Sequence, residues 1–364
     1  MTVERLRTAL IGCGKVGGIH ASALHALPEA DFVAACDADL GRAEALAGRF
    51  GARAFHDVGT MLDEAAVQAV TICTPHPLHA GPAILAARAG VHVLVEKPMA
   101  ASLRDCDAML AASREAGVKL GVISQRRWYE PVRRIKDAID AGKIGLPALG
   151  VFQMFSWRDP AYYRSDPWRG RWDTEGGGVL VNQSPHQLDL LRWFLGDVLE
   201  IGGDWANLNH PEIEVEDTAV ATVRFRTGAL GSIVTSVSQR PGLYTKVHVH
   251  GSNGASVGVE TDRGATFIAG VSEIAEPPLN DVWTIPGEED RLADFQAEDR
   301  LHFRQIDATT HYHALQVRDF LASIIEDRPP QVTGEDGREV VAMFTAIYRS
   351  RRERRPIPFP LQAE

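Results

Sequence analysis

Two short stretches of the chain carry side chains that could act on an alcohol. In Glu96-Lys97-Pro98 the lysine could donate to a substrate hydroxyl or to the oxyanion that develops from it. In the segment 182–189 (NQSPHQLD), His186 could accept a proton near neutral pH, and the Asn182 amide could orient the substrate or the imidazole. The alternatives are an ordinary exposed lysine after a strand and a capping or buried structural histidine.

The spacing within the second stretch predicts how its side chains are grouped. We expect one helix from about Val179 to Leu195, directly after the triplet Gly176-Gly177-Gly178. On a continuous helix, His186 shares a face with Asn182, four residues earlier, and with Asp189, three residues later.

A loop rich in aromatic and arginine residues precedes that helix. Its rings, with Trp157 and Tyr163 as the candidates for substrate binding, suit the C–H faces of a sugar; the alternative is that they fill a core or an interface. Three cations in the loop would also accommodate an acid or a nucleotide-sugar: Arg158, Arg164 and Arg169.

A glycine motif near the N-terminus predicts a dinucleotide site. The apolar run Ala9–Ile11 reads as a buried strand, and the residues that follow it, 12–17 (GCGKVG), open a helix. Gly12 permits the tight turn, Gly14 lets a pyrophosphate approach, and Gly17 allows the helix to pack on the strand. The phosphates would meet the N-terminus of that helix, near Lys15 and Val16. A purely structural strand-to-helix turn is the alternative.

The end of the second strand indicates which dinucleotide is bound. The run 31–36 (DFVAAC) ends at Asp37, where an acidic side chain binds the ribose 2′-hydroxyl of NAD and repels the 2′-phosphate of NADP. We therefore predict NAD in preference to NADP. Arg42 could instead bind a phosphate, and Asp37 could instead cap the helix that follows.

The order of the predicted elements gives an α/β protein with two domains. Apolar strands alternate with helices over residues 1–125, which indicates a doubly wound parallel sheet with ligands bound at the carboxyl ends of its strands. The remainder, 126–364, contains an antiparallel meander between about 196 and 260 and two closing helices, His313–Glu326 and Arg338–Ser350. Residues 261–310 have little pattern. Four predicted strand ends carry polar side chains: Asp37, Thr74, Lys97 and Gln125.

Composition excludes several classes of protein. The chain has 364 residues and a net charge of −10, which argues against general nucleic-acid binding. Its four cysteines form no C-x-x-C pair, so we expect no disulfide framework and no metal site. No apolar run is long enough to span a membrane, and the N-terminus lacks a secretory signal. We therefore expect a cytoplasmic protein.

The combined motifs resemble the Gfo/Idh/MocA oxidoreductases, typified by glucose–fructose oxidoreductase and inositol dehydrogenase. The resemblance spans essentially the whole chain. It rests on the segments 12–17, 73–79 (CTPHPLH), 96–98 and 176–189. It implies a Rossmann domain followed by an α/β domain with a large, open, mostly antiparallel sheet through which the protein would form a homodimer or homotetramer.

The resemblance also implies roles for single residues. Lys97 and His186 would be catalytic. The side chains expected along the cofactor are Thr74, Pro75, His79, Glu96, Lys97 and Gln125. The sequence departs from the family pattern at Asn182, where many members have aspartate, and at His76, where asparagine is frequent. The first departure removes an acid from the site.

These observations predict an NAD-dependent dehydrogenase acting on a secondary ring hydroxyl of a sugar, sugar derivative or cyclitol. Lys97, Asn182 and His186 would contact the substrate, together with Trp157 and Tyr163. Two alternatives remain: a non-catalytic regulator that senses the cofactor, and a glycoside hydrolase of the same fold that oxidises its substrate transiently with bound NAD.

Overall fold

The computed structural model describes residues 5–263 and 276–363, and the chain divides into two compact units. The first comprises residues 1–125, 309–341 and 363–364; the second comprises 126–308 and 342–362. Within the weakly patterned stretch 261–310, residues 264–275 lie outside the described part of the chain. No helix among the described residues is both long and apolar enough to cross a membrane.

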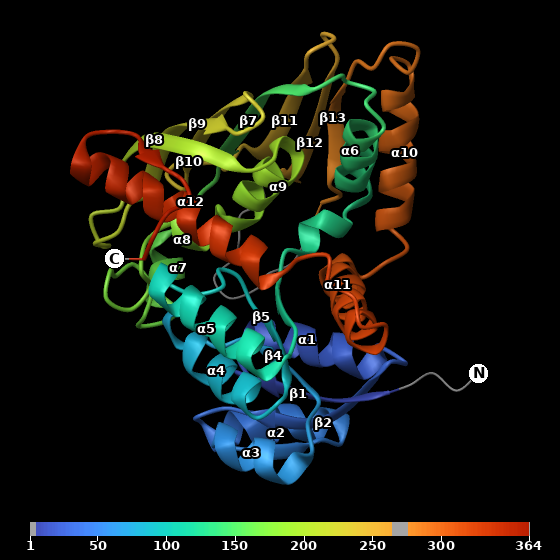
Figure 1. Ribbon diagram of the computed structural model, residues 1–364, viewed down its shortest axis with the longest axis vertical. Coiled ribbons are helices and arrows are strands. Elements are labelled where there is room, and N and C mark those ends of the chain that lie inside the picture. The colour runs from blue at the N-terminus through green and yellow to red at the C-terminus, as the bar shows by residue number, and fades with distance from the viewer. Residues whose placement is uncertain (1–4, 264–275, 364) are drawn as a thin grey trace. The chain divides into compact units, whose positions relative to one another are not determined.

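The first unit is built on a six-stranded parallel sheet with the order β3-β2-β1-β4-β5-β6. Its apolar strands are buried on both faces, and Figure 1 shows the helices that surround them. The strands are β1 (Leu6–Ile11), β2 (Ala30–Cys36), β3 (Arg53–Phe55), β4 (Ala69–Ile72), β5 (His92–Val95) and β6 (Leu120–Val122). The connecting helices are α1 (Lys15–Ala26), α2 (Leu40–Phe50), α3 (Val58–Ala65), α4 (Ala80–Arg88) and α5 (Leu103–Ala116).

Local sequence signals set the ends of these elements. Helix α5 begins at Ser102, whose hydroxyl accepts from the Asp105 N–H at 3.1 Å, and it ends at Gly117 in the left-handed conformation (φ = 66°). Both ends agree with the helix that the sequence predicts at 102–116.

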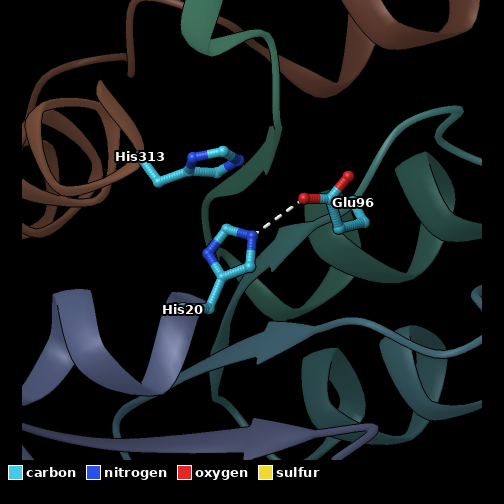
Figure 2. Close-up of side chains that lie close together, drawn as sticks. All are labelled: His20, Glu96 and His313. Atoms are coloured by element: carbon cyan, nitrogen blue, oxygen red, sulfur yellow. Dashed lines mark hydrogen bonds and ion pairs between the residues drawn. The ribbon is translucent and has the colours of Figure 1, made fainter. Parts of the chain in front are cut away.

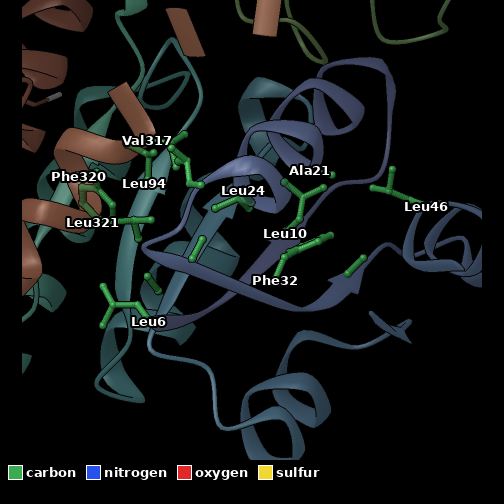
Figure 3. Close-up of a cluster of buried hydrophobic side chains, with 14 of the residues drawn as sticks. Leu6, Leu10, Ala21, Leu24, Phe32, Leu46, Leu94, Val317, Phe320 and Leu321 are labelled. Carbon is green, nitrogen blue, oxygen red and sulfur yellow. The ribbon is translucent and has the colours of Figure 1, made fainter. Parts of the chain in front are cut away.

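A late segment of the chain completes the first unit. Helix α11 (Ala308–Ile325) contributes Val317, Phe320 and Leu321 to the hydrophobic cluster around β1 and α1, as Figure 3 shows. Its Gln316 side chain accepts from the Ser124 N–H and donates to the Val122 carbonyl, each at 2.8 Å, and so continues the hydrogen bonding beyond β6.

The second unit is built on an eight-stranded mixed sheet, β13-β12-β11-β7-β10-β9-β8-β14. All neighbours pair antiparallel except β7 and β10, which run parallel. The strands are β7 (Pro147–Phe155), β8 (Val198–Ala206), β9 (Thr218–Phe225), β10 (Leu230–Ser236), β11 (Tyr244–Gly251), β12 (Ser256–Arg263), β13 (Leu279–Trp283) and β14 (Ile357–Pro358).

Helices pack on this sheet and leave part of it exposed. Side chains along β9 alternate strictly between buried and more exposed positions. The helices are α6 (Glu130–Asp140), α7 (Pro160–Arg164), α8 (Val179–Asn182), α9 (Pro185–Leu195), α10 (Arg291–Phe303) and α12 (Gly334–Glu353), whose residues up to Val341 count with the first unit. Strand β13 and helix α10 lie in the stretch that sequence patterns left unassigned.

Candidate functional site

The glycine loop after β1 has the geometry of a phosphate-binding turn. Gly12 has φ = +98°, and a Cβ there would lie 2.6 Å from the Cys73 carbonyl carbon. A Cβ on Gly17 would lie 2.2 Å from the Gly12 oxygen, whereas a Cβ on Gly14 would meet no atom within 4 Å. Packing therefore requires glycine at 12 and 17. The open space at Gly14, beside the N-terminus of α1 that no side chain caps, fits a pyrophosphate.

Asp37 braces this loop from the end of β2. Its Oδ2 accepts from the Cys13 N–H at 2.7 Å and its Oδ1 from the Asp39 N–H at 2.9 Å. Asp39, not Asp37, caps α2 through the Gly41 and Arg42 N–H groups, so the capping alternative for Asp37 is wrong. Each carboxylate oxygen retains acceptor capacity for the hydroxyls of a ribose.

His79 links the two loops at the ends of β4 and β5. Its Nδ1 lies 3.0 Å from the Pro98 carbonyl oxygen and its Nε2 lies 2.8 Å from the Thr74 carbonyl oxygen. A neutral imidazole can donate to only one of these acceptors. Burial lowers the pKa of the ring, which is fully buried. Because the side chain contacts only backbone in these interactions, its place favours holding the loops over contacting the cofactor.

Glu96 lies at the centre of a buried cluster next to Lys97. Figure 2 shows its carboxylate facing the His20 ring, with His313 from α11 beside them. The His20 Nε2 lies 2.8 Å from Glu96 Oε1, the Lys97 N–H donates to Oε2 at 3.0 Å, and the His20 and His313 rings meet edge to face. None of the sequence motifs pointed to His20 or His313.

The electrostatics of this cluster keep Glu96 ionised. Burial alone would raise its pKa, but the hydrogen bond from His20 and the positive charge that His20, His313 and Lys97 can carry lower it to about 2. Burial lowers the pKa of His313 to about 4. Donor atoms of the three side chains lie within 4.8 Å of one another and could hold a metal ion. The 2.8 Å contact has the length of a hydrogen bond, and we interpret the cluster as hydrogen-bonded.

The remaining residues predicted for the cofactor also lie at strand ends of the first unit. Thr74 follows β4 and donates its hydroxyl to the Leu78 carbonyl at 3.1 Å, and Pro75 precedes the short 3₁₀ turn His76–Leu78. Lys97 is partly exposed two residues after the end of β5, whereas Gln125 is largely buried where the chain leaves the unit after β6.

In the second unit, the helix predicted over 179–195 is interrupted. Helix α8 ends at Asn182 and α9 begins at Pro185, whose missing N–H and fixed φ prevent one helix from running through. Asn182 and His186 therefore do not share one helix, which corrects the prediction. His186 occupies the first turn of α9 and is 7% exposed.

Asp189 has a different partner from the one its spacing suggested. Its carboxylate forms a bidentate ion pair with Arg127, with Nε–Oδ2 at 2.8 Å, and both side chains are buried. Arg127 also lies over the Trp193 ring, 5.0 Å from its centroid. Asp189 thus anchors α9 to the segment before α6.

Asn182 lies against an acid that the sequence analysis missed. Its Nδ2 donates to Glu175 Oε1 and, at 3.1 Å, to the Tyr162 hydroxyl oxygen. Glu175 is 1% exposed, and its Oε2 accepts from the Gly170 N–H at 2.5 Å. The only sequence signal for this role is its position directly before the glycine triplet.

Glu216 holds the start of α8 in place. Its carboxylate accepts from the N–H groups of Gly178 and Leu180, both at 3.0 Å, and from the Tyr348 hydroxyl at 2.8 Å. A Cβ on Gly178 would lie 1.9 Å from the Glu216 carbonyl oxygen, which explains this glycine of the triplet. Burial raises the pKa of Glu216 to about 7, although its donors act in the opposite direction.

The aromatic loop is more buried than a substrate platform requires. Tyr163 is 8% exposed and packs edge to face on Tyr162 and His210, while Trp157 is half-buried beside His210. Tyr163 belongs to a small hydrophobic cluster with Ile213. These contacts favour the alternative that Tyr163 fills a core, whereas Trp157 retains an accessible surface.

Comparisons with known proteins decide the family. The model of the oxidoreductase family with an NAD-binding Rossmann fold matches residues 6–124, and that of the GFO/IDH/MocA C-terminal domain matches 132–257. A D-apiose dehydrogenase from Paraburkholderia graminis is 30% identical over 100% of this chain and 92% of its own. The chain belongs to the Gfo/Idh/MocA family.

Two further relatives of this Gfo/Idh/MocA protein match along their whole length. A myo-inositol 2-dehydrogenase from Thermotoga maritima is 28% identical over 97% of this chain and 98% of its own. The structure of the WlbA dehydrogenase from Bordetella pertussis, in complex with NADH and UDP-GlcNAcA, has a TM-score of 0.83 and 31% identity over 99% of this chain and 100% of that one.

Family membership confirms the predicted class of enzyme, cofactor and fold. The protein is an NAD-dependent oxidoreductase of the sugar and cyclitol dehydrogenase type, with a parallel Rossmann sheet and a mostly antiparallel second sheet. The regulator alternative is disfavoured, because the relatives above are named as dehydrogenases.

Proposed function

We propose that this protein oxidises a secondary ring hydroxyl of a sugar, sugar derivative or cyclitol with NAD, or catalyses the reverse reduction. The observation that carries the proposal is the position of Lys97. It follows β5 at the carboxyl edge of the parallel sheet, where such sheets bind their ligands, and its main-chain N–H is fixed by Glu96.

The proposed chemistry divides the two hydrogens of the alcohol between two acceptors. NAD, when bound, accepts the carbinol hydrogen as hydride. His186 takes the hydroxyl proton, Lys97 donates to the substrate oxygen and stabilises its developing charge, and Asn182 orients the reacting group. The alcohol carbon is thereby oxidised to a carbonyl.

The first unit has the features that an NAD site requires, namely an open approach at Gly14, an uncapped helix N-terminus and an acidic side chain at the end of β2. We assign residues 1–125 to NAD binding and 126–364 to substrate binding and oligomerisation, with 309–341 counted structurally with the first unit. The proposed cofactor residues are Gly12, Gly14, Lys15, Val16, Gly17, Asp37, Thr74, Pro75, Glu96, Lys97 and Gln125, with His79 holding the loops.

The substrate class is proposed from the relatives and the second unit. Two relatives are named as dehydrogenases of myo-inositol and D-apiose, and the structural neighbour is in complex with UDP-GlcNAcA. Trp157 offers a half-buried ring to such a substrate. Arg158 is buried in the same loop, where burial lowers its pKa but Tyr162 and Tyr163 favour its charge. An acidic sugar therefore belongs among the candidates.

We further propose that the protein self-associates through the exposed face of the second sheet. Val220, Leu149 and Leu230 are exposed apolar side chains on β9, β7 and β10, and the strand register places them on one face. Light scattering on the purified protein distinguishes a dimer or tetramer from a monomer. Four free thiols suit a reducing compartment, and we propose the cytoplasm as the site of action.

The test of the function is an NAD-reduction screen over monosaccharides, inositols, sugar acids and UDP-linked sugar acids. We expect one class to give sustained NADH formation. Lys97→Ala and His186→Ala should each lower kcat by roughly 10²–10⁴-fold. Substrate cleavage without net NADH release would instead identify a glycoside hydrolase, and no turnover on any panel member would contradict the proposal.

His186→Ala needs a second measurement because the side chain is buried. If His186 is structural, the variant melts at a lower temperature but its folded fraction turns over like the wild type. If it is the proton acceptor, turnover falls even in the folded fraction. Asp37→Ser tests the cofactor assignment separately, and should weaken NAD binding while narrowing its advantage over NADP.

A further inference from the structure

We propose that His210, in its doubly protonated form, is a positioning residue that holds the segment Trp157-Arg158 in place for the substrate. The inference rests on the proposed function, in which Trp157 offers its ring to the substrate. All the residues involved lie in the second unit. His210 belongs to none of the motifs in the sequence analysis, and the proposed chemistry does not use it.

Both ring nitrogens of His210 face hydrogen-bond acceptors. Nδ1 lies 3.0 Å from Asp217 Oδ2, and Nε2 lies 2.7 Å from the Arg158 carbonyl oxygen. The side chains of His210 and Asp217 are 1% and 0% exposed, so these contacts are shielded from bulk water. A neutral imidazole has one N–H and can donate to only one of the two oxygens, whereas an imidazolium donates to both.

Asp217 does not supply the second hydrogen. Its Oδ1 accepts from the Leu208 N–H at 3.0 Å, and its Oδ2 accepts from the Asn209 N–H at 2.8 Å. Burial alone would raise the pKa of Asp217, but the hydrogen bonds from His210 and from these two N–H groups lower it below its usual range. The carboxylate is therefore ionised, and the hydrogen of this contact is on Nδ1. A carbonyl oxygen can only accept, so Nε2 carries a hydrogen as well.

The charges around His210 favour this doubly protonated form. Burial lowers its pKa, but the hydrogen bonds to Asp217 and to the Arg158 carbonyl, with the negative charges of Asp217 and Glu212, raise it above its usual value. At His79 both acceptors are neutral carbonyls, and there burial lowers the pKa of the ring. The carboxylate is thus the feature that distinguishes His210.

His210 reaches the candidate substrate ring in two ways. The Arg158 N–H donates to the Val237 carbonyl at 3.0 Å while its own carbonyl accepts from His210, so the backbone directly after Trp157 is held on both sides. The Trp157 ring also lies beside the imidazole, with centroids 5.3 Å apart, and Tyr163 packs edge to face on it at 5.4 Å. Burial raises the pKa of Tyr163 far above its usual value, so this neighbour is neutral.

Loss of one proton from His210 should release the contact with Arg158 rather than the contact with Asp217. The remaining hydrogen stays on Nδ1, because a hydrogen bond to an ionised carboxylate is stronger than one to a neutral carbonyl. The Nε2 lone pair then faces the Arg158 carbonyl oxygen and repels it. Because the pKa of His210 is raised, the segment is held at pH 6.5 and below and is released as the pH rises through the higher value of the folded protein.

The test compares the KM for the substrate in the wild type and in His210→Gln, whose amide does not titrate. The ratio of the variant's KM to that of the wild type should be roughly 10 at about pH 6 and should fall toward 1 by about pH 9, because only the wild type loses a hydrogen bond over this range. Taking the ratio at each pH removes the titration of groups common to both proteins, such as His186. The KM for NAD should not change, because NAD is assigned to the first unit.

His248→Gln is the matched control. It also removes a histidine that is paired with an aspartate in the second unit, since His248 Nε2 lies 2.9 Å from Asp281 Oδ2. Its KM ratio should stay near 1 at every pH. If His210→Gln does not fold, Asp217→Asn replaces it in the test. Removing that charge lowers the pKa of His210, so the rise of KM should occur at a lower pH than in the wild type.

NMR of the histidine side chains measures the protonation itself without turnover. With ¹⁵N-labelled histidine, the wild type should show two protonated ring nitrogens for His210 at pH 7, and the signals are assigned by their loss in His210→Gln. A single protonated nitrogen would overturn the inference. Two protonated nitrogens with a KM ratio that is independent of pH would show that His210 serves only folding, and would overturn the positioning role. If the wild type turns over no member of the substrate panel, the proposed function fails and the positioning role fails with it, while the NMR result still decides the protonation of His210.

Discussion

Each unit of the protein buries a glutamate beside a segment that carries a candidate catalytic group, and the two carboxylates differ in their partners. Glu96 faces the His20 imidazole at 2.8 Å and has a pKa lowered to about 2. The donors to Glu216 among the described residues are neutral, with the Gly178 and Leu180 N–H groups and the Tyr348 hydroxyl among them, and burial raises its pKa to about 7. Hydrogen bonds from neutral donors do not offset the desolvation of a carboxylate here, whereas a partner that can carry positive charge does.

The difference gives the two units opposite responses to pH. The first unit should lose stability in acid because its unfolded state binds protons more readily. For His313, this loss occurs as the pH falls from 6.5 toward about 4, and for Glu96 it occurs from 4.5 toward about 2. Each group contributes at most about 1.4 kcal/mol per pH unit within its window.

Amide hydrogen exchange in β1 and β5 across this pH range measures the effect in the first unit. His313→Gln should flatten the dependence between pH 6.5 and about 4. Because the variant also removes a positive charge that lowers the pKa of Glu96, the loss of stability below pH 4.5 should become smaller. A wild-type stability that is flat between those values would contradict the shift of His313.

Replacing the charged carboxylate by an amide should be costly in the first unit. In Glu96→Gln an amide N–H must face either the Lys97 N–H or His20 Nε2, and His20 can accept it only in the tautomer that carries its hydrogen on Nδ1, a buried atom with no partner among the described residues. Either arrangement leaves a buried donor unsatisfied, which costs about 1–3 kcal/mol. Urea unfolding followed by hydrogen exchange in β5 measures the loss. Glu64→Gln is the control, because that side chain is half-exposed in a surface pair with Arg53 and should change stability by less than about 1 kcal/mol.

The same substitution in the second unit should cost little. Between pH 4.5 and about 7, Glu216 is protonated in the folded state and ionised in the unfolded state. Its contribution to the free energy of unfolding is therefore fully present below pH 4.5 and is lost as the pH rises through about 7. We expect Glu216→Gln to lower the free energy of unfolding by about 1 kcal/mol at pH 5. This difference from the wild type should shrink as the pH increases, because only the wild type loses the contribution of Glu216.

Tryptophan fluorescence suits this measurement, because all seven tryptophans lie between residues 128 and 283, within the second unit. If the loss of stability caused by Glu216→Gln grows as the pH rises, the pKa of Glu216 is not raised in the folded protein.

The smallest effect is expected at Tyr348. Tyr348→Phe removes one neutral hydrogen bond to Glu216 and should cost about 0.5–1.5 kcal/mol. Because that bond lowers the pKa of Glu216, its removal should raise the pKa further and move the fluorescence-detected pH transition to higher values. An unchanged transition would show that Tyr348 acts on Glu216 through packing alone.

Local patterns in the sequence predicted most of the first unit. Continuous apolar strands, a glycine motif and caps such as Ser102 act over a few residues, and the structure places these elements where the pattern predicted them. The capping alternative for Asp37 shows the limit, because two nearby aspartates could each cap α2 and only the backbone geometry selects Asp39.

The candidate site was less predictable because its supports come from distant parts of the chain. Glu216 lies 38 residues from Gly178, and His313 is far along the chain from Glu96. No periodicity relates such pairs. The break before Pro185 was readable from the proline, although the sequence analysis placed a single helix over 179–195.

The return of α11 to the first unit has a consequence for synthesis on the ribosome. The cluster around β1 lacks Val317, Phe320 and Leu321 until those residues have been translated. They follow residue 125 by about 200 positions, which at about 5–20 residues per second is roughly 10–40 s. During that interval the nascent Rossmann unit presents an incomplete apolar surface, while residues 126–308 of the second unit are translated. The main segments of the first unit end at residue 341 and those of the second at 362, so both cores can be completed only late in translation.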